Sequence, residues 1–294
     1  MPGPETATKL APYTDEKMRR LALLLLLVPL AAGCSSGAKK IVIQPAKTYK
    51  LADFEPAAPV SPRKPTTVAF TIDQPSGSPL TEYRTGAGPH TGVHLIIVRE
   101  DLALIIHRHP PLQAGGRFEQ KVVFPAPGRY RVIVDAYPQH GGPVPNFQLF
   151  KDIQVRGVPE PQPVGNYKPV QHVGGFTFSA PRRPRVKAIQ ASLMTVHVTN
   201  AAGKPAHFVP WYGALAHAIF FHVGTLDYFH THVCAAGATG CASLLAGAQV
   251  TGRSAAPGKL TIGVLLPTAG TWKLFLQARP DGHLVTVPYV LKAE

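Results

Sequence analysis

The chain has 294 residues, a formal net charge of +14, 27 glycines and 31 prolines. Glycine and proline follow no collagen period and lie among many apolar residues, so the composition indicates turn-rich β-structure rather than disorder. The positive charge favours an anionic neighbour such as lipid headgroups or wall polymer, and a solubilising surface explains it equally well. The sequence has no basic helix and no aromatic RNA-binding pattern, so it predicts no nucleic-acid partner.

An export signal lies near the start of the chain. Two arginines precede an apolar run over 21–30, which is too short for a comfortable membrane span. A charged start followed by a short apolar stretch is typical of a secretory signal peptide. We therefore predict a signal peptide over 1–33, in which 1–17 is an over-long start because the export signal begins at Met18.

The signal ends on small residues before a cysteine. Ala31, Ala32 and Gly33 precede Cys34, and this arrangement resembles the bacterial lipobox, in which the peptide is cut before a cysteine whose sulfur is diacylated. The departure is Ala31, where leucine is usual. Two or more acyl chains anchor a protein stably. We predict lipidation of Cys34, a tether over 34–40, and an extracytoplasmic protein that reaches the cell membrane through this lipid anchor.

The rest of the sequence contains two related units. Three histidines recur at a spacing of 123 residues, and a Pro-x-x-Gly-x-(Tyr/Trp) motif recurs at a spacing of 142 residues. The difference between these spacings predicts an insertion in the second unit, around 234–257. Because a repeat on this scale indicates duplicated domains, we predict units over 41–157 and 168–294, joined by a proline-rich, semi-stiff linker over 158–167.

Short apolar runs alternate with turn residues throughout both units. Six strand candidates per unit are dominated by Val, Ile, Phe, Tyr and Leu, with Gly, Pro and Asp between them and no amphipathic helix. This pattern is typical of immunoglobulin-like sandwiches, and the Pro-x-x-Gly-x-(Tyr/Trp) motif looks like a recurring corner of such modules. The predicted fold is all-β, with two tandem immunoglobulin-like β-sandwich domains after the signal and lipid anchor.

Each unit contains the pattern His-x12-His-x-His. A two-residue hairpin turn, at 100–101 in one unit and 223–224 in the other, would place the first histidine of each pattern opposite the second. Opposed residues share a face of the sheet, and a residue two positions further returns to that face. Three imidazoles would then converge in each unit and offer a three-nitrogen site for Cu(II) or Zn(II). The predicted metal ligands are His94, His107 and His109, and His217, His230 and His232.

Other interpretations of these histidines stay open. The face they share also carries apolar residues such as Ile96 and Ile219, so we expect it to be the core-facing side of each sandwich. Histidines at the end of a core can bond to backbone carbonyls and to each other. The alternative function is therefore an extracytoplasmic binding or scaffold module with structural histidines and an envelope protein as partner, and another ligand is a third interpretation. Among the remaining histidines, His90 and His140 are candidates to approach the cluster of the first unit.

Two cysteines lie in the predicted insertion, as Cys234-x6-Cys241. Outside the cytoplasm this spacing most simply predicts a disulfide that closes the loop. A copper site that combines Cys234 with His232 is the alternative. Known catalytic motifs are missing: the sequence has no Gly-x-Ser-x-Gly, no His-Glu-x-x-His and no phosphate loop, so we expect that the protein is not an enzyme.

Two pairs of segments carry a resemblance to a known family. They are 92–102 with 107–110, and 211–217 with 228–232. They resemble a family of secreted or lipid-anchored bacterial proteins, frequent in actinobacteria, that carry tandem Ig-like units with this histidine pattern. The resemblance covers nearly all of the mature chain. It implies an extracytoplasmic location and the tandem sandwich fold, and it implies no specific biochemical role.

Overall fold

The computed structural model of the protein describes residues 48–86, 88–140, 146–245 and 248–294. The predicted signal peptide, the predicted lipidation site at Cys34 and the tether lie outside these residues. No helix within the described ranges is long and apolar enough to cross a membrane. The described residues form two β-sandwiches, which we call module one (β1 to β7) and module two (β8 to β17).

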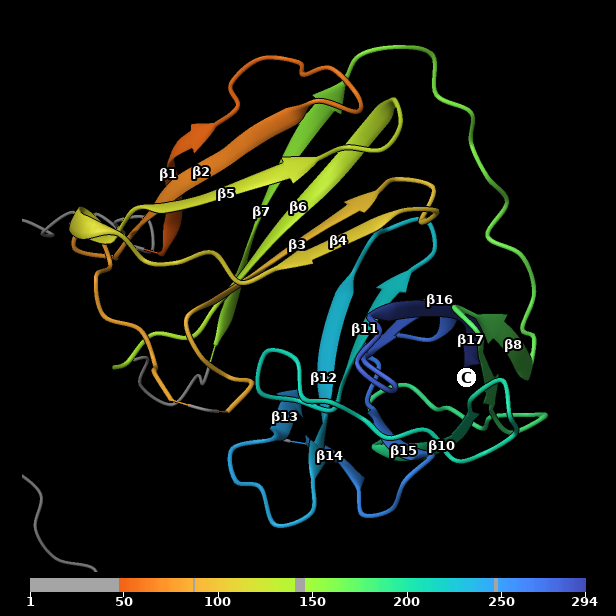
Figure 1. The fold of residues 1–294 in the computed structure, drawn as a ribbon. Coiled ribbons are helices and arrows are strands. Elements are labelled where there is room, and N and C mark those ends of the chain that lie inside the picture. Colours follow the sequence, from red (N-terminus) through yellow and green to blue (C-terminus); the bar gives the residue numbers. More distant parts are fainter. Residues whose placement is uncertain (1–47, 87, 141–145, 246–247) are drawn as a thin grey trace, which may run out of the picture. The chain divides into compact units, whose positions relative to one another are not determined.

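Module one has one three-stranded sheet, in the order β1-β2-β5, and one four-stranded sheet, in the order β4-β3-β6-β7 (Figure 1). All of its strand pairs are antiparallel. This division of seven strands between two facing sheets is that of an immunoglobulin-like sandwich, as the sequence predicts. The elements are β1 (Lys50–Glu55), β2 (Pro65–Asp73), β3 (Val93–Arg99), β4 (Ile105–Arg108), the 3-10 turn η1 (Ala114–Gly116), β5 (Phe118–Val123), β6 (Gly128–Ala136) and β7 (Phe147–Val155).

Module two repeats this plan and adds strands. Its sheet runs in the order β17-β16-β11-β12-β14-β15-β10-β9-β8, and β13 pairs with β14. The strands are β8 (Val170–Val173), β9 (Phe176–Ser179), β10 (Ser192–Thr199), β11 (Ala216–His222), β12 (Tyr228–Ala235), β13 (Ala242–Leu245), β14 (Ala248–Ser254), β15 (Lys259–Val264), β16 (Gly270–Ala278) and β17 (Val285–Ala293).

The additional strands β13 and β14 lie inside the predicted insertion (Figure 1). β14 pairs in parallel with β12 and antiparallel with β15, so it joins the two halves of module two. Gly252 on β14 makes this approach possible, because a Cβ atom there would lie 2.5 Å from the carbonyl oxygen of His232. The insertion therefore supports the strand that carries two of the predicted metal ligands.

The strands that carry the histidines are buried on both faces. On β3, Leu95 and Ile97 belong to the core of module one, whereas Ile96 belongs to a separate apolar cluster that also contains Ile219 and Phe221 of β11. The expectation that the histidine face is the core-facing side of each sandwich is therefore wrong, because this face packs against the other module. Alternation predicts which residues share a face, but a strand that is apolar throughout does not reveal which face is internal.

The same type of corner lies at the start of β6 in module one and of β16 in module two. In module one the hydroxyl of Tyr130 donates to the carbonyl oxygen of Ala126 at 2.9 Å, and in module two Trp272 Nε1 donates to the carbonyl oxygen of Thr268 at 3.0 Å. A side chain that bonds back to the backbone four residues earlier is the tyrosine corner of immunoglobulin-like domains. The Pro-x-x-Gly-x-(Tyr/Trp) motif therefore forms the corner that the sequence predicts in each module.

We predict that Tyr130→Phe lowers the free energy of unfolding of module one by about 1 kcal/mol, because it removes one hydrogen bond and leaves the Ala126 carbonyl without its donor. The ring would keep its packing on Phe124, whose centroid lies 5.0 Å away. Urea unfolding followed by circular dichroism measures the change. An unfolding midpoint equal to that of the wild type would contradict the role of this corner.

Candidate metal centre

The hairpins that carry the histidines have a register different from the predicted one. In module one Ile96, rather than His94, pairs with His107, and in module two His217 pairs with His232. Both predicted pairings, in which the first histidine opposes the second, are therefore wrong by two residues. The histidines still share one face, because a slip of two residues preserves the side on which every side chain lies.

Longer loops cause this shift. The last hydrogen-bonded pairs, 99 with 104 and 222 with 227, enclose four residues each, 100–103 and 223–226, in place of the predicted two-residue turns. Leu102 is the third residue of its loop and Leu226 the fourth of its own, and their φ angles are 59° and 60°. Leucine rarely adopts a positive φ, but both side chains are buried in the apolar cluster between the modules. Tertiary packing thus offsets the conformational cost of a leucine with positive φ. A turn assignment made from the sequence alone would not place leucine at such a position.

The two predicted three-histidine groups form one buried cluster between the modules. His94 Nδ1 of module one lies 3.3 Å from His230 Nδ1 of module two, and His107 Nδ1 of module one lies 3.0 Å from Gln277 Oε1 of module two. The two predicted groups therefore adjoin one another across the modules, and His217, His230 and His232 still form a group within module two. The histidine cluster consists of His90, His94, His107, His109, His217, His230 and His232.

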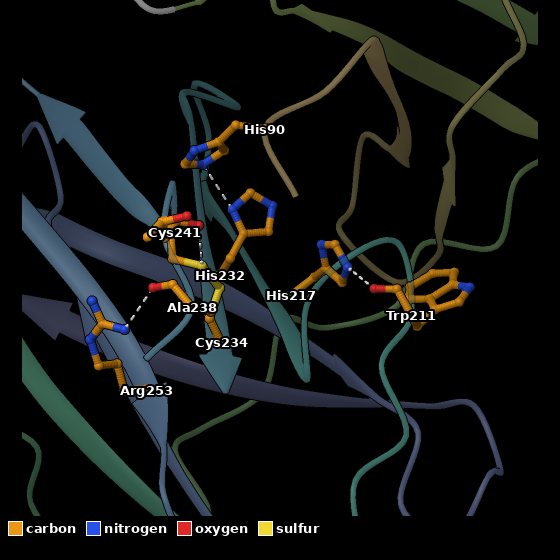
Figure 2. The surroundings of a disulfide bond; sticks show 9 residues. His90, Trp211, His217, His232, Cys234, Ala238, Cys241 and Arg253 are labelled. Carbon is orange, nitrogen blue, oxygen red and sulfur yellow. Dashed lines mark hydrogen bonds between the residues drawn. A yellow bond between two sulfur atoms is a disulfide. The ribbon is translucent and has the colours of Figure 1, made fainter. Parts of the chain in front are cut away.

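Of the two further candidates, only His90 joins the cluster. His90 Nε2 lies 3.0 Å from His232 Nδ1, and Figure 2 draws this contact between the two rings. His140 is exposed, and its Nε2 lies 3.3 Å from Glu82 Oε2. Residues that sequence reasoning missed also contact the histidine cluster, among them Gln277, and Trp211 through both its backbone carbonyl and its ring. Neither belongs to the recurring histidine pattern, which was the only signal available.

Backbone and side-chain carbonyls fix the protonated nitrogen of three rings. His94 Nε2 lies 2.7 Å from the Pro89 carbonyl oxygen, and His217 Nε2 lies 2.9 Å from that of Trp211 (Figure 2). His107 Nδ1 contacts an amide oxygen in the same way. A carbonyl oxygen only accepts, so these nitrogens carry the N–H. In each neutral ring, the other nitrogen then carries a lone pair.

Two of these lone pairs face the same ring. His94 Nδ1 lies 3.3 Å from His230 Nδ1, and His217 Nδ1 lies 3.3 Å from His230 Nε2. A neutral imidazole has a single N–H, so His230 can donate to only one of these neighbours. The other contact then sets one lone pair against another, an arrangement that a cation between the two nitrogens would stabilise.

His232 offers a further nitrogen without a partner. Its side chain is fully buried, and its Nε2 atom has no hydrogen-bond partner among the described residues. Such an atom costs free energy unless a donor or a cation satisfies it. Its ring lies beside the rings of His230 and His217, at centroid distances of 4.3 and 4.9 Å. The unpartnered nitrogen therefore lies among the lone pairs described above.

Two groups of three histidines have ligand atoms within 4.8 Å of one another. One is His217, His230 and His232, the set that the sequence predicts for the second unit. The other contains His94 and His107 of module one together with His230 of module two. His109 Nε2 lies 3.1 Å from His107 Nε2, and its ring stacks on that of Tyr212 at 3.9 Å. In the group that contains His94 and His107, His230 of module two thus takes the place that the sequence predicts for His109.

Burial keeps these imidazoles neutral. Removal from water, aided by repulsion from His90 at His217, from Arg84 at His90 and from His217 at His109, lowers the pKa of His217 and of His90 to about 4 and that of His109 to about 3. The same two causes hold the pKa values of the other four rings well below the ordinary range. A metal binds neutral imidazole, so at neutral pH the rings are in the form that a ligand requires.

One buried carboxyl group lies beside the cluster. Asp135 accepts hydrogen bonds from Asn146 Nδ2 at 2.6 Å, Gln148 Nε2 at 3.0 Å and the Tyr228 hydroxyl at 3.2 Å. Burial raises the pKa of Asp135 to about 6, against the effect of these donors. Its Oδ2 lies 4.0 Å from His230 Nδ1. At neutral pH, Asp135 therefore places a negative charge next to His230, the ring that belongs to both three-histidine groups.

Cys234 and Cys241 form the predicted disulfide (Figure 2). The bond closes the loop that follows β12, two residues after His232. Because the sulfur of Cys234 is bonded to Cys241, it does not serve as a thiolate ligand, and the alternative copper site that combines Cys234 with His232 is wrong for this state of the protein.

Comparison with known proteins gives a family and distant structural likenesses. A protein-family model described as a domain of unknown function (DUF8832) matches residues 48–154 and 171–294. No functionally curated protein matches the chain.

Three solved structures illustrate the likeness. The Escherichia coli adhesin FdeC has 13% identity, 84% coverage of this chain and a TM-score of 0.24, and this chain covers 63% of it. The Clostridium thermocellum CbhA fibronectin(III)-like modules have 14% identity, coverages of 84% and 93%, and a TM-score of 0.23. Invasin, a bacterial integrin-binding protein, has 15% identity, coverages of 84% and 39%, and a TM-score of 0.23. This chain thus spans less than two thirds of either the adhesin or invasin, and none of these likenesses identifies its partner.

We predict that the metal-free protein loses stability as the pH falls from about 7 to about 5. The clustered histidines stay neutral in the folded protein while the unfolded chain binds protons below the ordinary histidine pKa of 6.5, so each such ring costs about 2 kcal/mol of stability between pH 7 and pH 5. Asp135 has the opposite effect, because its pKa is raised, but it is one group against several. Thermal melts in a chelator measure the trend.

Two variants test whether the cluster causes this slope. His107→Asn, which removes a buried ring, should make the pH dependence shallower, whereas His197→Asn, which removes an exposed histidine of β10, should leave it unchanged. Equal melting temperatures at pH 7 and pH 5 in the wild type would contradict the assignment of neutral rings.

Proposed function

The chain belongs to the family described as a domain of unknown function (DUF8832), and we propose that its histidine cluster binds a divalent transition metal, Cu(II) or Zn(II), without catalysing a reaction. The observation that carries the proposal is the convergence of three buried imidazoles, one of which has a ring nitrogen with no hydrogen-bond partner among the described residues. The rings are those of His217, His230 and His232, each of which offers a ligand nitrogen within 4.8 Å of the others, and we assign these nitrogens as His217 Nδ1, His230 Nε2 and His232 Nε2.

A single set of tautomers leaves these three lone pairs free. The N–H of His217 is on Nε2, where it donates to Trp211. If the N–H of His230 is on Nδ1, it donates to the lone pair of His94 at 3.3 Å, and its Nε2 carries a lone pair. The Nδ1 atom of His232 contacts His90, which leaves Nε2. Carbonyls and second-sphere histidines that orient ligand rings in this way are usual around metal ions.

The distance between two of these nitrogens fits a tetrahedral ion. His217 Nδ1 and His230 Nε2 are 3.3 Å apart. Two nitrogens bound tetrahedrally at about 2.0–2.1 Å from one ion are separated by about 3.3–3.4 Å. The pair is therefore already spaced as ligands of a common ion, and little movement of the strands would be required on binding.

The donor set favours Cu(II) or Zn(II) over softer ions. Imidazole suits both metals, whereas Cu(I) prefers thioether and thiolate sulfur. Met194, the only methionine after the predicted signal peptide, is buried in the core of module two. Cys234 is in a disulfide. The cluster therefore offers nitrogen ligands alone.

Burial of the ligands argues against catalysis. The side chains of His94, His217 and His232 have no exposed surface, so a substrate would not reach an ion held among them. We propose a binding or stabilising role for the ion. The second candidate function is a scaffold or binding module of the envelope whose histidines are structural, and the network of bonds between the imidazoles and the backbone carbonyls favours it.

We also propose that the protein works outside the cytoplasm, attached to the membrane through Cys34. The lipobox-like sequence at 31–34 supports the anchor. The Cys234–Cys241 disulfide supports an oxidising compartment, where such bonds persist. An envelope protein, the membrane and a metal ion are the partners consistent with this location.

We expect the full chain, purified in detergent, to retain Zn(II) or Cu(II) after dialysis and to melt at a higher temperature with the ion, because an ion that binds only the folded state stabilises it. His232→Asn should lower the retained metal and abolish the rise in melting temperature. The Asn amide keeps a polar group where His232 Nδ1 contacts His90 and removes the Nε2 ligand. Elemental analysis measures the metal.

The matched control for this experiment is His197→Asn, which should retain as much metal as the wild type. If wild type and His232→Asn retain equally little metal, and His232→Asn only lowers the melting temperature, the histidines are structural and the second candidate function is correct.

A separate prediction concerns the anchor. When the full chain is expressed in a bacterial host supplied with labelled palmitate, the label should appear on the protein and the protein should be found in the membrane fraction. Cys34→Ser should remove both, whereas Cys241→Ser should keep the label. A labelled Cys34→Ser variant would contradict lipidation at this residue.

A further inference from the structure

We propose a second metal site that spans the two modules and shares His230 with the first. Its ligands are His94 and His107 of module one and the remaining ring nitrogen, Nδ1, of His230. The ligand atoms of these three histidines lie within 4.8 Å of one another, and all three side chains are buried. This inference rests on the proposed metal-binding function and names a second ion within the same cluster.

The two ligands from module one each direct their N–H to a carbonyl oxygen, and their other nitrogens face neighbouring imidazoles, His230 Nδ1 beside His94 and His109 Nε2 beside His107. His94 holds its N–H on Nε2, against the Pro89 carbonyl at 2.7 Å, and so leaves Nδ1. His107 holds its N–H on Nδ1, against Gln277 Oε1 at 3.0 Å, and so leaves Nε2. Each N–H has a carbonyl as acceptor, so neither ring needs to change tautomer to bind an ion.

Each ring nitrogen of His230 contacts a different three-histidine group. Its Nδ1 lies 3.3 Å from His94 Nδ1, and its Nε2 lies 3.3 Å from His217 Nδ1. Both distances match the separation of about 3.3–3.4 Å between two nitrogens on one tetrahedral ion. The ring therefore lies between two positions of similar geometry, and an ion at each would make it a bridge.

A bridging ring has to lose its remaining proton. The first ion binds at the Nε2 lone pair of His230 while Nδ1 keeps its N–H. When the second ion binds, the Nδ1–H bond breaks, the proton passes to solvent, and a bond forms between Nδ1 and the ion, so that one positive charge leaves as two arrive. The bridging imidazolate carries one negative charge, and Asp135 Oδ2, 4.0 Å from His230 Nδ1, supplies another.

The two sites would differ in what they require of the protein. All the ligands of the first ion belong to module two, whereas the second ion needs ligands from both modules. Contacts independent of metal hold the modules and the linker in place. They include the apolar cluster around Ile96 and Phe221 and the hydrogen bond from Gln162 N to Asp101 Oδ2 at 2.8 Å. The second ion would therefore fasten an interface that is already formed.

The test counts metal in the full chain, purified in detergent, with variants that remove one ligand and preserve its anchor. His94→Gln keeps an amide donor for Pro89, and His107→Asn keeps one for Gln277. We expect two Zn(II) ions per chain in the wild type, one in His94→Gln and in His107→Asn, one in His232→Asn, and none in His230→Leu. His197→Asn is the control and should retain two ions.

A spectroscopic measurement tests the bridge without any variant. Cu(II) is added to the metal-free wild type, and the electron paramagnetic resonance signal is integrated at one and at two equivalents. Two Cu(II) ions joined by an imidazolate couple magnetically, so the signal should rise to one equivalent and then fall. In His94→Gln the signal should stop rising at one equivalent and should not fall.

The outcomes separate the two proposals. A wild type that retains one ion, unchanged in His94→Gln, would overturn the second site and leave the proposed function intact. Two ions with independent Cu(II) signals would overturn the bridge. A wild type that retains no ion would overturn the proposed function and this inference together. Because the copper titration uses wild-type protein, the test of the bridge holds even if a variant fails to fold.

Discussion

The structure depends on how seven imidazoles are satisfied after they leave water. Because the seven rings are neutral, each has one N–H donor and one nitrogen with a lone pair. Three donors, those of His94, His107 and His217, are directed to carbonyl oxygens. At most four donors remain for seven lone pairs, so some lone pairs find no donor within the cluster. A buried acceptor without a partner is costly, and His232 Nε2 is such an atom among the described residues. A metal ion binds nitrogens that offer a lone pair of this kind.

Duplication explains why the surplus arises between the modules. Each module brings the same hairpin, with its histidines on the face opposite its own core, and the apolar residues of that face are buried only when the two hairpins pack together. This packing removes the histidines from water along with their neighbours. Module two adds support of its own, because β14 and the Cys234–Cys241 disulfide brace the strand that carries His230 and His232. The two equivalent histidine hairpins therefore differ in their support, because only that of module two is braced in this way.

Much of the fold could be predicted from the sequence, because its signals are local. The corner at Tyr130 and the Cys234–Cys241 disulfide follow from short motifs. The shared face of the histidines survived a wrong register because side chains alternate with a period of two. The cluster itself could not be predicted, since His94 and His230 are 136 residues apart and meet only through packing between the modules. Asp135 and Gln277 belong to no repeated pattern, so no sequence signal marked them.

Burial has two opposite effects on an ion in this cluster. It lowers the histidine pKa values, so protons compete weakly with a metal at mildly acidic pH, where an exposed histidine site would release its ion. It also penalises the charge that the ion brings, because a low dielectric disfavours an isolated cation. Asp135 offsets part of this penalty and is itself held by three amide or hydroxyl donors. A second ion would add two more positive charges to the same volume, so it becomes tolerable only if the ring between the ions gives up its proton. The charge balance of the cluster therefore favours a shared His230 over two independent sites.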